Sequence, residues 1–121
     1  MESTVGFRGT KDNITFANNA VTPITTADIG KPVKINDITD GSVILAGDGE
    51  VFVGIVQVVD SSGVGVICGG CVECTPLAAD AIATAQNFAV AGTGGTVKRS
   101  ATATNAISIY AADGKVWLRL S

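Results

Sequence analysis

The sequence predicts an all-β fold: a small β-barrel or β-sandwich of two pseudo-repeated β-units, with an extended N-terminal arm and at most one short helix. Three observations predict it. Hydrophobic residues make up 46% of the 121-residue chain and charged residues only 16%. Short runs rich in Val and Ile alternate with turns that contain Gly, Asp, Asn or Ser. Similar β signals also recur about half a chain apart.

The apolar runs define the strands that we expect along the chain. They are 33–35, 43–45, 51–59, 64–68, 88–90, 96–98, 107–110 and 116–120. Asp-Gly pairs at 40–41, 48–49 and 113–114 predict tight turns between them. The one helical candidate is the alanine-rich segment 78–86, which is about two turns long and lacks an amphipathic stripe.

Four pairs of β signals recur at offsets of 53 to 55 residues. They are Thr22-Pro23-Ile24 with Thr75-Pro76-Leu77, Val33 and Ile35 with Phe88 and Val90, Gly41-Ser42-Val43 with Gly95-Thr96-Val97, and Val53-Gly54-Ile55 with Ile107-Ser108-Ile109. They predict two units, about 22–74 and 75–121. Because a unit of about 50 residues cannot bury a good core alone, we expect both units to form one β-domain, 22–121.

Residues 1–21 lie outside the repeat, and we interpret them as an extended arm with one short strand at 14–16. The apolar and basic side chains of the arm are candidates for contact with a partner: Phe7, Arg8, Ile14 and Phe16. Removing residues 1–21 is then expected to leave a folded barrel that binds its partner less well. The polar start of the chain does not have the pattern of a signal peptide, and no apolar stretch reaches the roughly 20 residues of a membrane span. We therefore expect synthesis in the cytoplasm and no membrane partner.

The three cysteines, Cys68, Cys71 and Cys74, have the spacing C-x-x-C-x-x-C. The spacing is similar to the first three ligands of an iron–sulfur run, but the chain has no fourth cysteine. A metal site completed by another chain and a disulfide are the alternatives to our main interpretation, in which these cysteines are small apolar residues of a strand. Together with Trp117, they are candidates for a subunit interface.

Little in the sequence indicates catalysis. The chain has no His, and its net charge is −3, so that we expect no imidazole-based active site and no nucleic-acid partner. Five of the 11 carboxylates lie in apparent turns, where Asp most often caps the backbone: Asp37, Asp40, Asp48, Asp60 and Asp113. Calcium binding by Asp37 and Asp40, or by Asp48 and Glu50, is the alternative. Lys98 lies near a glycine-rich turn, as the modified lysine of lipoyl and biotinyl domains does, which leaves a carrier role as a further alternative. We predict no enzyme, no catalytic residue, no bound metal and no cofactor.

The order of several motifs resembles the small capsid decoration, or cement, proteins of tailed bacteriophages. The motifs are Lys31-Pro32-Val33-Lys34-Ile35, Gly41-Ser42-Val43-Ile44-Leu45-Ala46, Val53-Gly54-Ile55-Val56, Gly63-Val64-Gly65-Val66 and the Val-rich last strand. The resemblance covers residues 22–121. The cysteine cluster departs from the pattern of the family, and the arm at 1–21 varies among such proteins.

The resemblance implies a non-enzymatic structural protein of the virion. Such proteins are small β-barrels, often homotrimers, that bind the outer surface of the mature head and stabilise contacts between major capsid subunits. The expected partners are therefore the major capsid protein and further copies of the chain, and the expected location is the outer capsid surface after synthesis in the host cytoplasm. The alternative function is a small carbohydrate- or ligand-binding β-module on a larger assembly.

Overall fold

The computed structural model describes residues 11–121, which are mostly strands, with no helix beyond single 3-10 turns. The predicted all-β class is confirmed. The strands are β1 (Lys11–Asn18), β2 (Pro32–Asp37), β3 (Ser42–Leu45), β4 (Gly54–Asp60), β5 (Gly63–Cys74), β6 (Ala89–Ala91), β7 (Val97–Arg99), β8 (Ala106–Ala112) and β9 (Lys115–Leu120). The 3-10 turns are η1 (Thr26–Asp28), η2 (Ala81–Ala83) and η3 (Thr93–Gly95). The alanine-rich segment 78–86 thus contains only the short turn η2.

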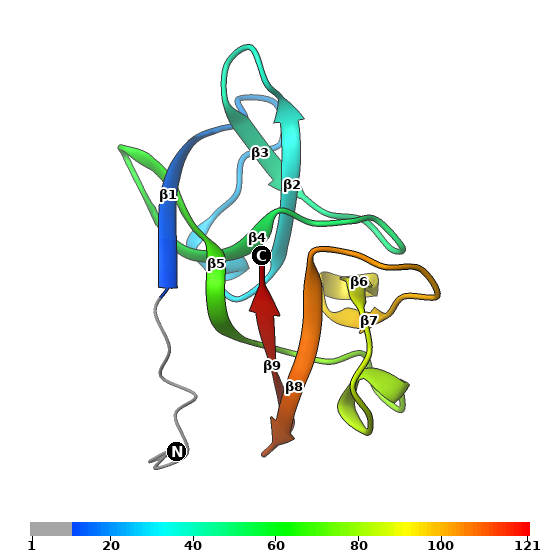
Figure 1. Cartoon of the computed structure of the whole chain (residues 1–121). Helices are drawn as coiled ribbons and strands as arrows, with labels where there is room; N and C mark the ends of the chain where they lie inside the picture. Colours follow the sequence, from blue (N-terminus) through cyan, green and yellow to red (C-terminus); the bar gives the residue numbers. More distant parts are fainter. Residues whose placement is uncertain (1–10) are drawn as a thin grey trace.

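Five strands close into a barrel in the order β1-β3-β2-β4-β5, because β1 also pairs with β5 (Figure 1). All neighbours are antiparallel except β1 and β3, which are parallel. Alternate residues of the strands point inward and are mostly β-branched, which suits a narrow barrel interior. The buried core consists of Ile24, Val33, Val43, Val56, Val64 and Val66.

The same neighbour relations recur in the second half of the chain. The end of β5 pairs with β9, β9 with β8, and β6 with β7, all antiparallel. Single bridges join Phe88 to Ile107 and, in parallel, Pro76 to Val97. The end of β5 therefore has the place that β1 has in the first barrel, and the second set of strands surrounds a second core. We call the two sets the first and second barrels. β5 belongs to both.

Side chains of β5 lie in both cores, because the alternation of side chains between the two faces of the strand shifts by one residue within it. Val64 and Val66 point into the first barrel, whereas Val72 and Cys74 point into the second. Between them, Cys68 is an extra residue opposite β1, where the register changes at Asp12 and Asn13. Gly70 follows with a φ of 80°, a conformation that favours glycine. Because of the bulge and this glycine, the even-numbered side chains of β5 point into the first core before Cys68 and into the second core after Gly70.

The first strand corrects the prediction of an arm at 1–21. Residues 11–18 form a long strand, which pairs with β5 from Lys11 to Phe16 and with β3 at Ala17 and Asn18. Phe16 packs against the first core. The Asn18 side chain also bonds both the N–H and the C=O of Ile24, each at 2.8 Å. Residues 11–18 are thus part of the barrel, because the open side between β3 and β5 needs a strand.

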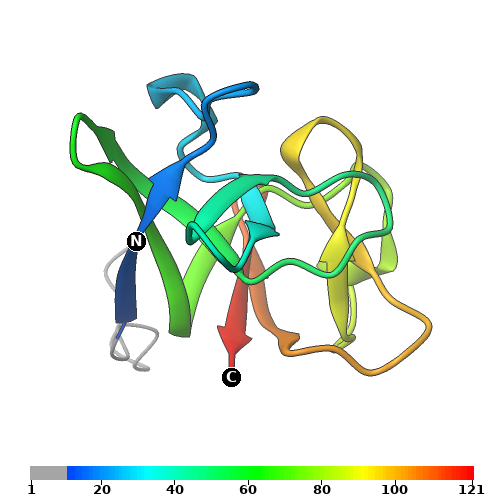
Figure 2. The ribbon, with the colours of Figure 1, turned by 90° about the horizontal axis from the view of Figure 1, so that it is seen from above.

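The loop between β3 and β4 links the two barrels. It buries Ala46 and Phe52 in the second core although it leaves from the first barrel. Its backbone pairs with β6, since Gly49 N–H donates to Ala91 O at 2.8 Å and Ala91 N–H donates to Glu50 O at 2.9 Å. Figure 2 shows this blue-green loop crossing toward the yellow strands of the second barrel. The two cores are therefore held together by a shared strand and by this loop.

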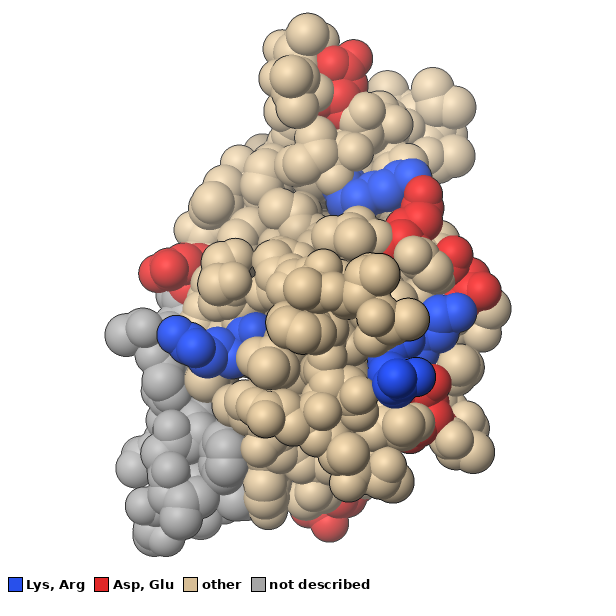
Figure 3. Space-filling model, turned by 45° about the vertical axis from the view of Figure 1, so that its right-hand side comes forward, with Lys and Arg blue, Asp and Glu red and all other residues tan. Residues whose placement is uncertain are grey.

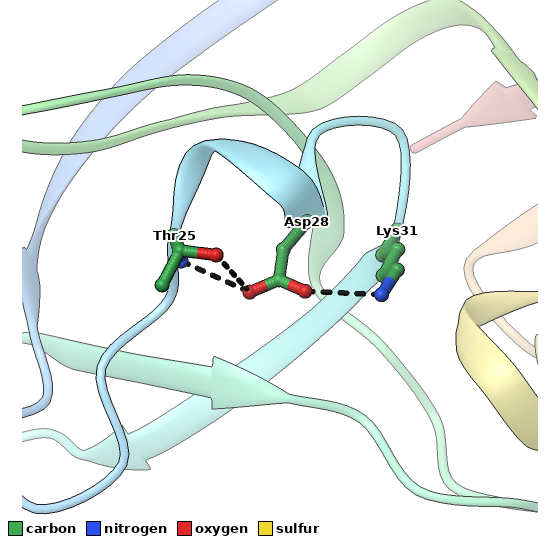
Figure 4. Close-up of polar contacts among 3 residues, drawn as sticks. All are labelled: Thr25, Asp28 and Lys31. Carbon is green, nitrogen blue, oxygen red and sulfur yellow. Dashed lines mark hydrogen bonds and ion pairs between the residues drawn. The ribbon is translucent and has the colours of Figure 1, made fainter.

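The turn η1 is held by one carboxylate, Asp28 (Figure 4). Asp28 accepts hydrogen bonds from the Thr25 N–H at 2.9 Å and the Thr25 hydroxyl at 3.4 Å, and forms an ion pair with Lys31 at 3.0 Å. The Thr25 N–H lowers the pKa of this carboxyl most, and Lys31 lowers it further. Just after the turn, Gly30 N–H donates to Val56 O, which anchors the segment to β4.

Replacing Asp28 with alanine is expected to destabilise the protein by about 1 kcal/mol at pH 7, the size of a lost capping interaction. Because the pKa of Asp28 is lowered by folding, the ionised group stabilises the protein above its unfolded pKa, and this contribution is lost as the pH falls through the folded value. Urea unfolding at pH 7 and at pH 3 measures this. An equal loss of stability at both pH values would contradict the assignment.

Candidate binding surface

Large apolar side chains are exposed on both barrels and on their loops. Two stand out because they lie in turns: Val21 is 87% exposed and Ile38 is 88% exposed. Among the described residues, the set is Ile14, Val21, Ile29, Ile38, Leu45, Val51, Val58, Phe88 and Ile109. Figure 3 shows one face of the molecule, where the middle of the surface has no charged side chains. Scattered exposed apolar residues are normal, but nine of them within residues 11–121 offer apolar area to a partner.

A groove of about 550 Å³ lies between β8 and η2 with its following linker. Its lining contains no charged side chain: Ile82, Ala83, Thr84, Ala85, Gln86, Ser108, Ile109, Tyr110 and Ala111. The Tyr110 ring also contacts the half-buried Trp117 on β9, with ring centroids 5.4 Å apart. The groove is therefore a neutral depression beside a strand.

A buried serine holds the linker in place. The Ser108 hydroxyl accepts from Asn87 N–H at 2.9 Å and lies 3.1 Å from the carbonyl oxygen of Ala85, to which it donates. Ser108 N–H also donates to Asn87 O at 2.9 Å. In the first barrel, Val56 has the corresponding position beside a bulge. The linker from η1 to Pro32 is one residue shorter than the linker from η2 to Phe88, the counterpart of Pro32. The longer linker and its serine belong to the second barrel.

Sequence reasoning did not find the groove or the exposed turn residues. One signal could have found Val21 and Ile38: each is a β-branched residue among turn-forming residues, in Asn-Ala-Val-Thr and Asp-Ile-Thr-Asp. A hydrophobic residue in such a place is not explained by turn chemistry. No comparable signal exists for the groove, because its walls come from segments more than 20 residues apart.

The cysteines do not converge on one point. Cys68 is half-buried against the first core and its thiol donates to Val66 O at 3.6 Å. Cys74, only 3% exposed, lies in the second core. Cys71 is half-buried and lies opposite Arg119 of β9 in the β5–β9 ladder. All three are free thiols, and within residues 11–121 no group of three His, Cys, Asp or Glu side chains is placed to hold a metal ion.

Alkylation distinguishes the three thiols. Burial raises the pKa of the Cys74 thiol far above its usual range, and burial also raises that of Cys68. We expect iodoacetamide at pH 8 to leave Cys74 unmodified in the native protein and to modify all three cysteines in urea. Intact mass with peptide mapping measures this. Alkylation of Cys74 without denaturant, at the rate seen in urea, would contradict its place in the core.

The described candidates for contact with a partner lie on three strands: Ile14 and Phe16 on β1, the cysteines on β5 and Trp117 on β9. Ile14 is 49% exposed on β1, whereas Phe16 is half-buried against the first core. Phe7 and Arg8 lie outside the described residues. Trp117 is half-buried and lies on β9 opposite Glu73 of β5. Of these side chains, Ile14 is the one that the described structure leaves open to a partner, and Cys74 is used by the chain's own core.

The carboxylates considered for calcium already have partners. Asp37 accepts from Thr39, which lowers the pKa of Asp37, and Asp40 accepts from Ser42 N–H at 2.9 Å. Glu50 pairs with Lys34 and accepts from Gly47 N–H at 2.6 Å, and the Lys34 hydrogen bond lowers its pKa most.

Lys98, the residue considered for a carrier role, pairs with Asp48 at 2.9 Å. It lies in the middle of β7, whereas a carrier lysine has to reach another protein. Its ion pair instead joins the second barrel to the β3–β4 loop.

No helix of the described residues is long and apolar enough to cross a membrane. Compared with models of protein families, with curated proteins and with solved structures, the chain matches none of them.

Proposed function

We propose that this chain is a capsid decoration protein: a non-enzymatic component of a phage virion that binds the outer surface of the mature head and stabilises contacts between major capsid subunits. The observation that carries the proposal is the order of motifs over residues 22–121, which resembles this family. A protein of this kind needs area to bury against its partners and no reactive group.

The surface of the molecule supports the proposal. Exposed apolar residues occur at turns and strand edges of both barrels, so that several sides of the molecule can contact a partner. Three of the lysines form ion pairs within the chain: Lys31, Lys34 and Lys98. These pairs leave a surface of low charge, which suits burial between subunits because few charges need to be desolvated.

Binding to heads tests the proposal. The purified protein is mixed with expanded and with unexpanded heads of the phage that encodes it, both prepared without their own decoration protein. We expect saturable binding to expanded heads, at a fixed number of copies per head, and a higher melting temperature of the decorated shell. Absence of binding to both kinds of head would contradict the proposal.

The homotrimer is part of the same proposal. Native mass spectrometry of the free protein and of protein released from heads compares the oligomer with the 12.1 kDa chain. We expect three chains per particle in at least one of the two samples, because a trimer combines weak contacts by avidity. Monomers in both samples would contradict the trimer but not binding to the head.

The groove beside β8 favours the second candidate function, a small ligand-binding β-module. Its volume, about 550 Å³, is within the range of small-molecule sites, and Tyr110 lines it. This function predicts saturable binding of an oligosaccharide to the free protein, with a change in the fluorescence of Trp117, which contacts Tyr110. Screening a glycan array with the wild-type protein tests it.

A further inference from the structure

We infer that the groove between η2 and β8 is a strand-addition site, in which an extended, uncharged segment of the major capsid subunit pairs with the open edge of β8. This inference rests on the proposed function and names the contact through which it would act.

β8 is the last strand of the seven-stranded sheet, and β9 is its one ladder partner in the described residues. On its other side, the linker is bonded to Ser108, and Phe88 bridges to Ile107. These contacts cover the start of the strand. Beyond these contacts, Ile109 and Ala111 line the groove, and Ala112 is the next residue of the strand. An exposed edge of this kind is a template for an added strand.

The edge lacks the charged residues that usually prevent strand pairing. β8 has the sequence Ala-Ile-Ser-Ile-Tyr-Ala-Ala, without charge and without proline. Its bulge lies between Ser108 and Tyr110, at the part that the linker contacts. By comparison, β7 of the two-stranded sheet contains Lys98 and Arg99. Natural proteins protect edges with charges or proline, so that β8 is the edge best suited to accept a partner.

The groove determines what kind of segment fits. All nine of its lining residues are uncharged, and five are Ala or Ile. A charged side chain placed there would lose water without gaining an opposite charge. Small methyl groups on both walls, Ala83 and Ala85 on one and Ala111 on the other, leave room for alternate side chains of a bound strand. The occupant is therefore an extended segment with small or apolar side chains.

The two barrels differ at the linker that borders the groove. In the first barrel, the shorter linker after η1 is held directly to β4 by two bonds, Gly30 N–H to Val56 O and Val56 N–H to Lys31 O. In the second barrel, Ser108 N–H likewise donates to Asn87 O, but Asn87 N–H donates to the serine hydroxyl instead of a backbone oxygen, and the groove lies beside this longer linker. The first barrel closes with a shorter linker. The longer linker that borders the groove in the second barrel is therefore not required for the fold.

Three matched substitutions test the inference. Ala85→Lys and Ala111→Lys place a charge on opposite walls of the groove, and Ala101→Lys places the same charge in the β7–β8 loop, where it does not line the groove. All three alanines are exposed, so that the variants are expected to fold like the wild type. Thermal unfolding verifies this, and binding to expanded heads is then measured for all four proteins.

We expect the two groove variants to bind expanded heads at least about tenfold more weakly, which corresponds to about 1.4 kcal/mol, while Ala101→Lys binds like the wild type. Hydrogen exchange of the wild type is expected to slow at residues 106–112 on binding. Equal binding by all four proteins would overturn the groove contact while the proposed function stands. A groove variant that loses its trimer but still binds heads would assign the groove to a second copy of the chain and overturn the inference as well. If the wild type itself fails to bind, the proposed function fails, and this inference with it.

Discussion

Deleting residues 1–21 is expected to abolish cooperative folding, whereas deleting residues 1–10 is expected to leave the barrels intact. The longer deletion removes β1, and with it the pairs to β5 and β3 that close the first barrel. It also removes Phe16 from the first core and the Asn18 side chain that bonds Ile24. Loss of a large core side chain alone costs about 3–5 kcal/mol, and small domains have only about 5–15 kcal/mol in total.

Circular dichroism during heating measures this difference. The protein without residues 1–10 keeps β1 whole, and we expect it to unfold in one transition near the wild-type temperature. It also tests the predicted arm, because Phe7 and Arg8 are absent from it while Ile14 and Phe16 remain. Weaker binding of this variant to expanded heads would support a contribution of the first ten residues. A wild-type-like melting curve for the protein without residues 1–21 would contradict the role of β1.

The sequence was most informative where one local rule decides the structure. Runs of β-branched residues between turns predicted the strands, and all the predicted runs contain or overlap strands or bridges of the structure. The match of Gly41-Ser42-Val43 with Gly95-Thr96-Val97 has a structural counterpart: both glycines have positive φ, and both valines are fully buried in strands. Composition and turn chemistry act locally, which is why they can be read from the chain alone.

Three of the four sequence matches are out of step with the structure. Pro76 bridges Val97 as Asn18 pairs with Val43, so that Pro76 corresponds to Asn18 and not to Pro23, and Phe88 corresponds to Pro32 and not to Val33. The match at Val53-Gly54-Ile55 is two residues out of step. The pairings place Ile107 opposite Phe88, as Ile55 lies opposite Pro32, so that Ile55 corresponds to Ile107 and not to Ile109. Both strands have a bulge just after this point, and an alternating pattern read across a bulge loses its phase.

Other features depend on contacts between distant segments and could not be predicted. β1 was interpreted as an arm because it lies before the repeat, yet its counterpart in the second barrel is the end of β5. The bulge at Cys68 and the positive φ of Gly70 determine that Cys74 points into the second core, and no sequence pattern at these two residues predicts this. The groove needs the packing of η2 against β8, which no local pattern encodes.

Replacing Phe52 with alanine is expected to destabilise the protein by about 3–5 kcal/mol, the range for truncation of a buried aromatic side chain. Phe52 is 1% exposed and lies in the second core, although the loop that carries it comes from the first barrel. We expect the variant to unfold in one transition, because β5 runs through both barrels and neither can lose it without the other. Its neighbour Val51 is 57% exposed, so that Val51→Ala is a matched control, with an expected effect within about 0.5 kcal/mol.

Urea unfolding with two signals shows whether the barrels are one cooperative unit. Circular dichroism reports on all strands, whereas the fluorescence of Trp117, the single tryptophan, reports on β9 in the second barrel. Coincident curves for the wild type and for Phe52→Ala are the expected result. A fluorescence change at lower urea than the loss of strands would mean that the second barrel unfolds first and alone. In that case Phe52 would stabilise only the second core, and the shared strand would not couple the two barrels.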